Sequence, residues 1–197
     1  MIGNDIVDLQ LAKKESDWKR PRFLQKLFTP IERNFIERSP HKDKVIWLLW
    51  SRKESVYKIV VRMQKRRFYA PKQFENCTFD ADIEGQVTYK GMTFSTTSEA
   101  TDTHIHTVAQ LATNQQPLIT NCFILAHSTY SSQHTITRQK LMKEYATRST
   151  LSIQELSIQK DEWKVPHLYH KNQRQVDLIS IAHHGSFGGY ALQKKPQ

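Results

Sequence analysis

The sequence predicts a globular fold of mixed helices and strands, and three observations support this prediction. Apolar residues recur at helical spacing in several segments before residue 65. From Phe74 onward the pattern changes to the alternation that is typical of strands. Hydrophobic residues make up 38% of the 197 residues, which is enough for a packed core in one domain or two small ones.

The first segment, residues 1–9, alternates in a way that suits a short strand, with Asp5 on the same face as Gly3 and Val7. A carboxylate among apolar neighbours at a strand end needs a partner or a metal ion. In the alternative interpretation, Asp5 or Asp8 caps the segment that follows. This segment alone does not decide between the two.

Two short helices are expected before residue 40. Leu24, Leu27 and Phe28 lie at helical spacing and predict a short amphipathic helix. The segment Thr29–Glu32 has a capping Thr, a Pro at the first helical position and a Glu at the third, which predicts a helix through about Arg38.

Residues 43–64 carry the clearest helical pattern, with Trp50, Glu54 and Tyr57 on one apolar, aromatic face. A carboxylate on a buried face must be paired, protonated or bound to metal. The alternative is an ordinary i,i+4 ion pair between Glu54 and Lys58 on a half-exposed face.

Strands dominate the expected structure after Phe74, with one further helix. The turn signal Glu84-Gly85 predicts a hairpin between Thr78–Ile83 and Gln86–Phe94, with Gly91 as a further bend. The other expected elements are a strand at Cys122–Ala126, a helix over Arg138–Tyr145, and strands within residues 151–182.

The net charge of +10, from 29 Lys and Arg against 19 Asp and Glu, predicts attraction to a polyanion. Nucleic acid, anionic lipid, an acidic protein and a nucleotide-like ligand all qualify. No apolar run approaches the length of a membrane span, and the N-terminus carries acids where a signal peptide needs lysines. We therefore expect a cytoplasmic protein without membrane contact.

Cysteines and histidines give no strong signal for a metal or a disulfide. Cys77 and Cys122 are far apart in sequence, which favours free thiols. The pairs His104-x-His106 and His183-His184 have no third ligand at a recognisable spacing, so a zinc site is not expected. The metalloprotease, serine-hydrolase and P-loop motifs are absent from the sequence.

Four separated fragments stand out together: Gly3-Asn-Asp-Ile-Val-Asp8, Trp50-Ser-Arg-Lys-Glu-Ser-Val-Tyr-Lys58, Lys164-Val-Pro166 and Ser180-Ile-Ala-His183. The set resembles the 4′-phosphopantetheinyl transferase superfamily, whose members carry G-[IV]-D-x-V-[DE], W-x-x-K-E-[AS]-x-x-K, G-x-P and S-x-S-H elements. The fragment order is similar to that of the short holo-acyl-carrier-protein synthase type, in which the histidine element lies near the C-terminus.

The resemblance implies an α+β fold, with a long helix packed on a small antiparallel sheet. It implies one domain over residues 1–197, in which about 75–155 form an enlarged insertion. The implied reaction moves 4′-phosphopantetheine from coenzyme A to a serine of an apo acyl or peptidyl carrier protein. Mg²⁺ would bridge the pyrophosphate and offset charge on the leaving group, and it prefers carboxylate ligands together with waters and phosphates.

The resemblance also implies roles for individual residues. Asp5 and Glu54 would hold Mg²⁺ and, with Lys58, form the catalytic set. Glu54 would be a metal ligand, or also the base for the carrier serine, and the sequence leaves both open. The residues expected to bind coenzyme A are Lys53, Lys58, Pro166, Ser180 and His183.

Four features of the sequence depart from the family pattern. Val7 stands where the longer type often has a second carboxylate, so we expect a water in that metal position. Ala182 replaces the Ser before the motif histidine, which removes one expected hydroxyl contact to coenzyme A. Ser55 replaces the commoner Ala, and Lys164 to Pro166 matches the G-x-P element only loosely.

Because each fragment occurs once, we expect a homo-oligomer, with a trimer favoured, in which the histidine element of one chain faces the carboxylates of its neighbour. The basic segment Lys13–Lys26 is expected to dock the acidic face of the carrier. The alternative function is a basic nucleic-acid-binding module, with Phe68 and Tyr69 between the charges of residues 62–72. A third is an inactive scaffold with this fold.

Overall fold

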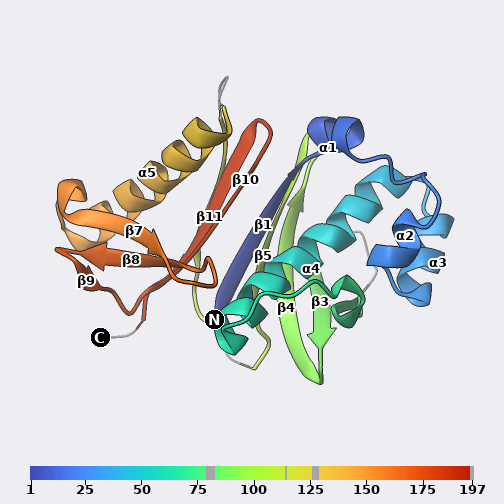
Figure 1. Ribbon diagram of the computed structural model, residues 1–197, viewed down its shortest axis with the longest axis horizontal. Coiled ribbons are helices and arrows are strands. Elements are labelled where there is room, and N and C mark those ends of the chain that lie inside the picture. Colours follow the sequence, from blue (N-terminus) through green and yellow to red (C-terminus); the bar gives the residue numbers. More distant parts are fainter. Residues whose placement is uncertain (79–82, 114, 126–128, 196–197) are drawn as a thin grey trace.

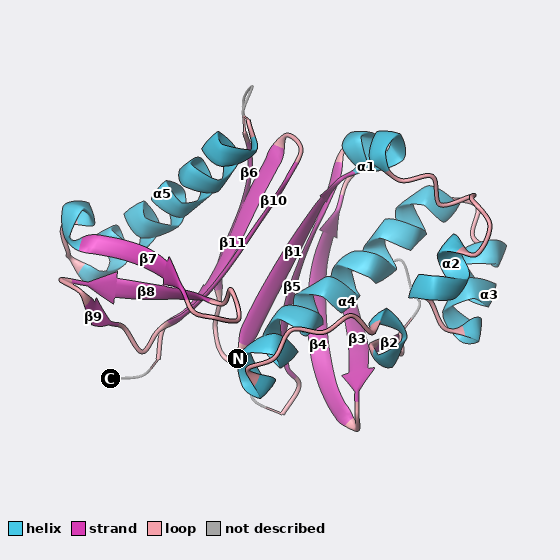
Figure 2. Cartoon of the chain, viewed as in Figure 1, coloured by secondary structure: helices cyan, strands magenta, loops and turns pink. Residues whose placement is uncertain are grey.

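The computed structural model describes residues 1–78, 83–113, 115–125 and 129–195, and these form two α+β units that lie side by side (Figure 1). In the first unit the long helix α4 packs on a five-stranded sheet of order β1-β5-β4-β3-β2. In the second unit helix α5 packs beside two three-stranded sheets, β10-β11-β6 and β7-β8-β9 (Figure 2). Each pair of hydrogen-bonded strands is antiparallel, so the expected α+β class with a long helix on an antiparallel sheet is confirmed.

The elements follow one another along the chain in this order. They are β1 (Ile2–Asp8), α1 (Leu9–Glu15), α2 (Phe23–Leu27), α3 (Pro30–Arg38), α4 (Lys42–Gln64), η1 (Pro71–Gln73), β2 (Glu75–Asn76), β3 (Glu84–Tyr89), β4 (Met92–Ala100), β5 (His104–Leu111), β6 (Ile119–Ile124), α5 (Tyr130–Ser149), η2 (Ile153–Glu155), β7 (Leu156–Lys160), β8 (Pro166–His170), β9 (Gln173–Arg174), β10 (Leu178–His184) and β11 (Phe187–Gln193).

The predicted start of α3 is confirmed in detail. The Thr29 hydroxyl accepts from the backbone N–H of Glu32, and the Glu32 carboxylate accepts from the backbone N–H of Thr29. These reciprocal bonds satisfy two backbone donors that a helix start otherwise leaves unpaired. Asp8 caps α1 by accepting from the backbone N–H groups of Gln10 and Leu11, as one of the two interpretations of this segment predicted.

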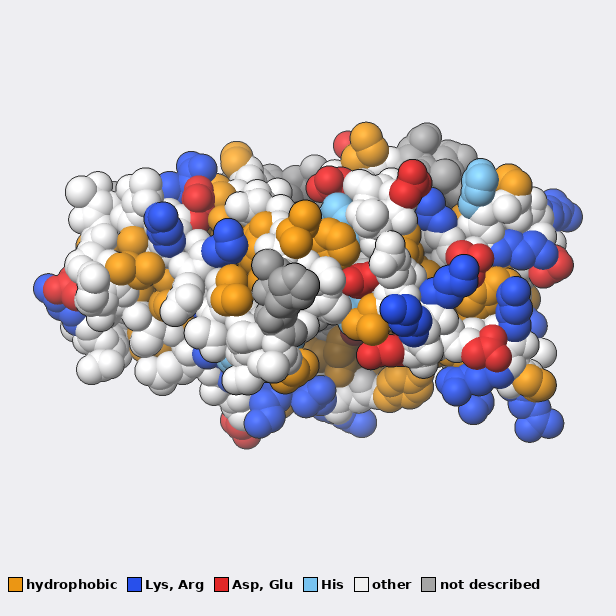
Figure 3. All heavy atoms as spheres, turned by 90° about the horizontal axis from the view of Figure 1, so that it is seen from above, with side chains coloured by type: hydrophobic (Ala, Val, Ile, Leu, Met, Phe, Trp, Pro, Cys, Tyr) orange, Lys and Arg blue, Asp and Glu red, His pale blue; other side chains and the backbone are white. Residues whose placement is uncertain are grey.

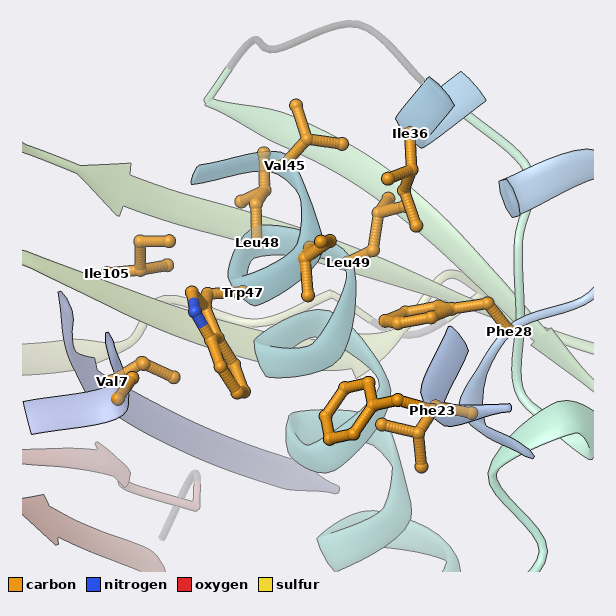
Figure 4. Close-up of a cluster of buried hydrophobic side chains, with 12 residues drawn as sticks. Val7, Phe23, Phe28, Ile36, Val45, Trp47, Leu48, Leu49 and Ile105 are labelled. Carbon is orange, nitrogen blue, oxygen red and sulfur yellow. The ribbon is translucent and has the colours of Figure 1, made fainter. Parts of the chain in front are cut away.

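Helix α4 is held mainly by buried apolar side chains. At its N-terminal half, Trp47 and Leu49 pack in a cluster with Phe28 and Ile36 (Figure 4). Farther along, Gly3 lets β1 approach the helix closely, because a Cβ on this glycine would overlap the carbonyl oxygen of Ser55. The close approach brings the Asp5 face of β1 against the middle of α4.

The predicted turn at Glu84-Gly85 is wrong. Both residues lie within β3, and the chain reverses at Lys90-Gly91, where φ is 46° and 79°. A left-handed turn of this kind matches the twist of the flanking strands, and glycine adopts it without a steric penalty. The expected first strand of the hairpin falls largely on residues 79–82, which lie outside the described part of the chain.

Residues 75–155, expected to form an insertion, are built into both units. Strands β2 to β5 complete the first sheet beside β1, and β6 pairs with β11 in the second unit. The expected helix over Arg138–Tyr145 is present and runs longer, from Tyr130 to Ser149. The expected strand at Cys122–Ala126 is β6, which begins earlier, and Ala126 itself lies outside the described residues.

The two units meet where β1 and β10 lie alongside each other. The backbone N–H of Asn4 donates to the Ser180 hydroxyl over 2.9 Å, and that of Asp8 donates to His184 Nδ1 over 2.9 Å. The Asp8 carboxylate also accepts from the backbone N–H of Ser186 at 2.9 Å. These bonds fix the position of one unit relative to the other.

Among the described residues, no helix is both long enough and apolar enough to cross a membrane.

Candidate active site

A cavity of about 270 Å³ lies between the two units. Helix α4 forms one wall, and the other wall comes from α5, β10 and the segment that joins β7 to β8. The first unit contributes Ile2, Glu54, Tyr57, Lys58, Val61, Arg62 and Arg67. The second unit contributes His134, Arg138, Lys160, Trp163, Lys164, Val165, Pro166, Ser180, Ile181 and His183.

Glu54 is the acidic side chain in this lining, and its environment is unusual for a carboxylate. The pKa of Glu54 is raised to about 7, mainly by burial and also by the nearby Asp5 carboxylate, while Lys58 opposes both effects. Asp5 lies on β1 and is also partly buried. The fold therefore brings together the two carboxylates that the sequence selected.

Lys58 lies beside this pair of carboxylates. Its Nζ donates to the backbone oxygen of Asn4 over 2.6 Å and to Asp5 Oδ1 over 3.3 Å. The alternative interpretation of an i,i+4 ion pair between Glu54 and Lys58 is therefore wrong. No hydrogen bond or ion pair to the Glu54 carboxylate is present among the residues that the structure describes.

The donor set of Asp5 and Glu54 fits a hard divalent cation. Two neighbouring carboxylates, one of them half-buried without a hydrogen-bonded partner in the described chain, concentrate negative charge that a cation would neutralise. Within the described residues, no group of three His, Cys, Asp or Glu side chains is arranged to hold a metal. Other ligands would therefore have to come from water or from a bound phosphate.

The rest of the cavity is strongly basic. Burial lowers the pKa of Lys160, and neighbouring cations lower it further. Those cations come from both units, so their side chains converge on one region of the cavity. They are Arg138, Lys164, Arg67 and Lys58.

Sequence reasoning pointed to only some of the cations of this cavity. Arg67 lay in a basic run that was recognised as able to bind phosphates, and Lys164 lay in a recognised fragment. Arg138 and Lys160 carried no signal, because nothing local distinguishes them from other surface cations. Their place in the cavity follows from the packing of α5 on β7 and β10 within the second unit and from the packing of β10 against β1 of the first unit.

The Arg62 side chain has a structural role, because hydrogen bonds hold it to the backbone of the second unit. Its guanidinium donates to the backbone oxygen of Ile179 over 2.7 Å and to that of Pro166 over 3.4 Å. Burial lowers its pKa to about 10. Arg62 thus ties α4 to β8 and β10 and helps to keep the two walls of the cavity together.

His183, which the resemblance implied as a coenzyme A-binding residue, lies on the second wall. Its Nδ1 lies 3.1 Å from the Gln133 side-chain oxygen, and its ring meets Tyr130 edge-on at 5.0 Å between centroids. The pKa of His183 is lowered to about 4, mainly by burial and also by neighbouring groups such as His134 and Lys160. The imidazole is therefore neutral at neutral pH.

The other predicted residues of the second unit also reach the cavity. Ser180 and Pro166 both line it, although the Ser180 hydroxyl already accepts from the Asn4 backbone. Ala182 does not line it, because its side chain packs with Ile6 and Phe187. A hydroxyl at position 182 would therefore lie among apolar side chains in this structure.

Lys164 stands at the glycine position of the family's G-x-P element, and its backbone has a conformation that glycine favours. Its φ is 66°, in the left-handed region that glycine adopts without penalty and that costs other residues about 1 kcal/mol. The turn is held by Asp161, whose carboxylate accepts from the backbone N–H groups of Trp163 and Val165. The strained position carries a cation that lines the cavity.

The prediction that Lys53 helps to bind coenzyme A is wrong. Its side chain is 1% exposed and does not line the cavity. Its Nζ donates to the Glu32 carboxylate over 2.7 Å and to the backbone oxygens of Leu27 and Pro71 over 2.9 and 3.1 Å. Adjacent helical residues point about 100° apart, so Glu54 faces the cavity while Lys53 faces α2 and α3.

We expect Lys53→Met to destabilise the protein without changing its affinity for coenzyme A. The substitution leaves the buried Glu32 carboxylate without its cation, and breaking such a pair typically costs about 3–5 kcal/mol. Urea unfolding gives the stability, and calorimetric titration of the folded protein gives the affinity. The exposed Lys14→Met is the matched control and should change neither. Weaker binding at unchanged stability would contradict the assignment.

The expectation that a neighbouring chain supplies the histidine is also wrong for this structure. Glu54, Lys58 and His183 line one cavity within a single chain. The second α+β unit, built partly from residues 115–155, provides the opposite wall. The reason for expecting a trimer is therefore gone, and the oligomeric state itself stays a prediction.

Comparison with known proteins gives one family. The model of a family described as the 4′-phosphopantetheinyl transferase superfamily matches residues 1–122, which include β1 and the whole of α4. No curated protein sequence matches the chain. Among solved structures, Helicobacter pylori holo-[acyl-carrier-protein] synthase in complex with coenzyme A aligns at 13% identity, covering 98% of each chain, with a TM-score of 0.23. This score is too low to support an argument about the site.

Proposed function

Because the chain belongs to the 4′-phosphopantetheinyl transferase superfamily, we propose that it transfers 4′-phosphopantetheine from coenzyme A to a serine of an apo acyl or peptidyl carrier protein. The observation that carries the proposal is the cavity between the two units. It combines a carboxylate pair on one wall with cations from both walls. We also propose that the activity is cytoplasmic.

The chemistry of coenzyme A fits the cavity. The molecule carries a pyrophosphate and a phosphomonoester, which require several cations when they leave water. Lys58 lies next to the carboxylate pair and is suited to the pyrophosphate. Arg138, Lys160 and Lys164 lie on the second wall and are suited to the remaining phosphate charge.

In the proposed reaction the serine oxygen attacks the phosphorus that bears the pantetheine arm. A new phosphorus–oxygen bond forms to the serine, and the bond to 3′,5′-adenosine bisphosphate breaks. The serine proton passes to Glu54, directly or through a water, and a pKa of about 7 suits a base at neutral pH. Lys58 and the cations of the second wall offset charge on the departing phosphate.

Asp5 and Glu54 are the residues that would hold Mg²⁺. When bound there, the ion would neutralise negative charge on the pyrophosphate oxygens and orient them.

The direct test is mass spectrometry of an apo acyl carrier protein and an apo peptidyl carrier domain after incubation with this protein, coenzyme A and Mg²⁺. We expect each accepted carrier to gain the mass of one phosphopantetheine. Coenzyme A with Mg²⁺ should also raise the melting temperature, whereas an oligonucleotide should not. Stabilisation by the oligonucleotide alone would favour the nucleic-acid-binding alternative, and coenzyme A binding without transfer would favour an inactive scaffold.

We expect Lys58→Ala and His183→Ala to weaken coenzyme A binding, by roughly tenfold for the loss of each charged or hydrogen-bonding contact. Isothermal titration calorimetry measures the dissociation constant. Ser186→Ala serves as a control in the second unit, because this side chain does not line the cavity. Unchanged affinity in both test variants would remove these two residues from the binding site.

A mixing experiment tests the single-chain site. We expect a mixture of Glu54→Ala and His183→Ala chains to be as inactive as either variant alone, since each chain contains one complete cavity with one defect. Carrier modification measured over a range of mixing ratios checks this. Recovery of activity toward a quarter of the wild-type value would show that residues are exchanged between chains.

The basic segment expected to dock the carrier lies at the end of the molecule that carries α2 and α3. Lys and Arg side chains gather at this end in Figure 3, and Lys19, Arg20, Arg22 and Arg33 line an open groove there. We propose this groove as one part of the docking surface for an acidic carrier.

A further inference from the structure

The segment that follows α4 doubles back along the helix. We call residues 65–71 the return loop. The Phe68 ring meets Tyr57 of α4 at 5.6 Å between centroids, and Lys53 Nζ donates to the backbone oxygen of Pro71 over 3.1 Å. These contacts fall successively closer to the start of α4, so the loop runs antiparallel to the helix. Figure 1 shows this segment passing in front of α4.

This path brings Tyr69 near Glu54. The residues on either side of Tyr69 are anchored beside positions 57 and 53 of α4, which flank Glu54. Desolvation of the hydroxyl raises the pKa of Tyr69, and the Glu54 carboxylate raises it further, so the two groups are within electrostatic range. The Tyr69 side chain as a whole is 75% exposed, among the most exposed large aromatic side chains in the described chain.

Tyr69 lies outside the cavity that is proposed to hold coenzyme A. Arg67, two residues earlier, lines that cavity, and Tyr69 does not. In phosphoryl transfer the attacking and leaving oxygens are roughly in line on opposite sides of the phosphorus. If the leaving group occupies the cavity, the serine must approach Glu54 from outside it. The return loop borders that approach.

We propose that Tyr69 is a contact residue for the carrier protein, next to the carrier's reactive serine. The inference rests on the proposed transferase function and adds a second part to the docking surface. It makes Tyr69 a determinant of the affinity for the carrier and leaves the binding of coenzyme A to the residues that line the cavity.

The composition of the loop fits a partner of this kind. An exposed tyrosine gives a large contact area at a low cost in conformational entropy, and tyrosines are enriched among the residues that dominate interface affinity. No Asp or Glu occurs between Glu54 and Glu75. The cations in or beside the loop are Lys65, Arg66, Arg67 and Lys72. The partner surface is therefore acidic with an apolar spot, in keeping with a carrier rather than a neutral ligand.

The experiment compares Tyr69→Ala and Tyr69→Phe in the full chain, with an apo acyl carrier protein as the probe. We expect Tyr69→Ala to raise the Michaelis constant for the carrier roughly five- to thirtyfold, as truncation of a central interface residue does. Tyr69→Phe keeps the ring and should raise it less than threefold. The dissociation constant for coenzyme A should stay within twofold in both variants. Val176→Ala, at a side chain 69% exposed in the second unit, is the matched control and should change nothing.

Each other outcome has a distinct meaning. If the Michaelis constant for the carrier and the dissociation constant for coenzyme A rise together, Tyr69 contacts the nucleotide rather than the carrier, and the inference is wrong. An unchanged Michaelis constant in a folded Tyr69→Ala protein with unchanged melting temperature also overturns it. A wild-type protein that binds coenzyme A but modifies no carrier would instead refute the proposed function, and this inference with it.

Discussion

Asp5→Asn and Glu54→Gln are each expected to lower kcat/KM for carrier modification by roughly a thousandfold or more while the chain stays folded. Each substitution removes one of the two carboxylates that approach each other at the cavity, and an amide is a far weaker ligand for Mg²⁺. Carrier modification at saturating coenzyme A measures the loss. Circular dichroism shows that the fold is retained.

Asp8→Asn is the matched control on the same strand. Asp8 accepts hydrogen bonds from the start of α1 and from Ser186, and it does not line the cavity. We expect this variant to lose about 1 kcal/mol of stability, because an amide nitrogen replaces one of the two accepting oxygens, and to keep most of its activity. Near-normal turnover in either carboxylate variant would rule out the proposed mechanism.

The second large effect is on stability. In metal-free buffer, Glu54→Gln should stabilise the fold at pH 8 by up to about 3 kcal/mol, because the pKa of Glu54 is raised from about 4.5 to about 7 and each unit corresponds to about 1.4 kcal/mol. The folded state prefers the protonated carboxyl. The stability that this preference provides is complete below pH 4.5 and is lost as the pH rises through 7. Because glutamine cannot ionise, the Glu54→Gln protein keeps this stability at pH 8.

Urea unfolding of both proteins at pH 4 and pH 8 tests this expectation. The difference between wild type and Glu54→Gln should be near zero at pH 4 and large at pH 8. Glu162→Gln, at an exposed side chain, should give no pH-dependent difference. Equal effects at both pH values would show that Glu54 is not desolvated as the structure has it. A substitution that stabilises the fold and removes activity is expected at a residue whose position serves function rather than stability.

Much of the fold was predictable from local sequence. The capping box at Thr29 and Glu32, the length of α4 and the β1 strand all follow from side-chain chemistry within a few residues. The hairpin turn was mispredicted because Glu84-Gly85 and Lys90-Gly91 both carry a turn signal. Only pairing with β4 decides which glycine lies in the turn.

The site was predictable where the residues belong to recognisable fragments. Asp5, Glu54, Lys58, Pro166, Ser180 and His183 were all selected from the sequence, and five of these six line the cavity, with Asp5 beside them. Lys53 was selected by the same fragment and proved to be buried against Glu32. A helical pattern gives the direction of a side chain, but it does not tell which elements cover that side.

The sequence by itself therefore determined the helix that carries Glu54 and Lys58, because its pattern depends on short-range spacing. The carboxylate pair and the histidine element were selected from the sequence through fragments that resemble the family. Only the tertiary structure decided that one chain provides both walls of the cavity, because residues 115–125 and 129–195 fold into a second α+β unit whose place depends on contacts such as Asn4 to Ser180. The same packing brought Arg138 and Lys160 to the site, whereas contacts within the first unit turned the return loop back beside Glu54. The contact between Asn4 and Ser180 joins residues 176 positions apart, and local spacing carries no information about it.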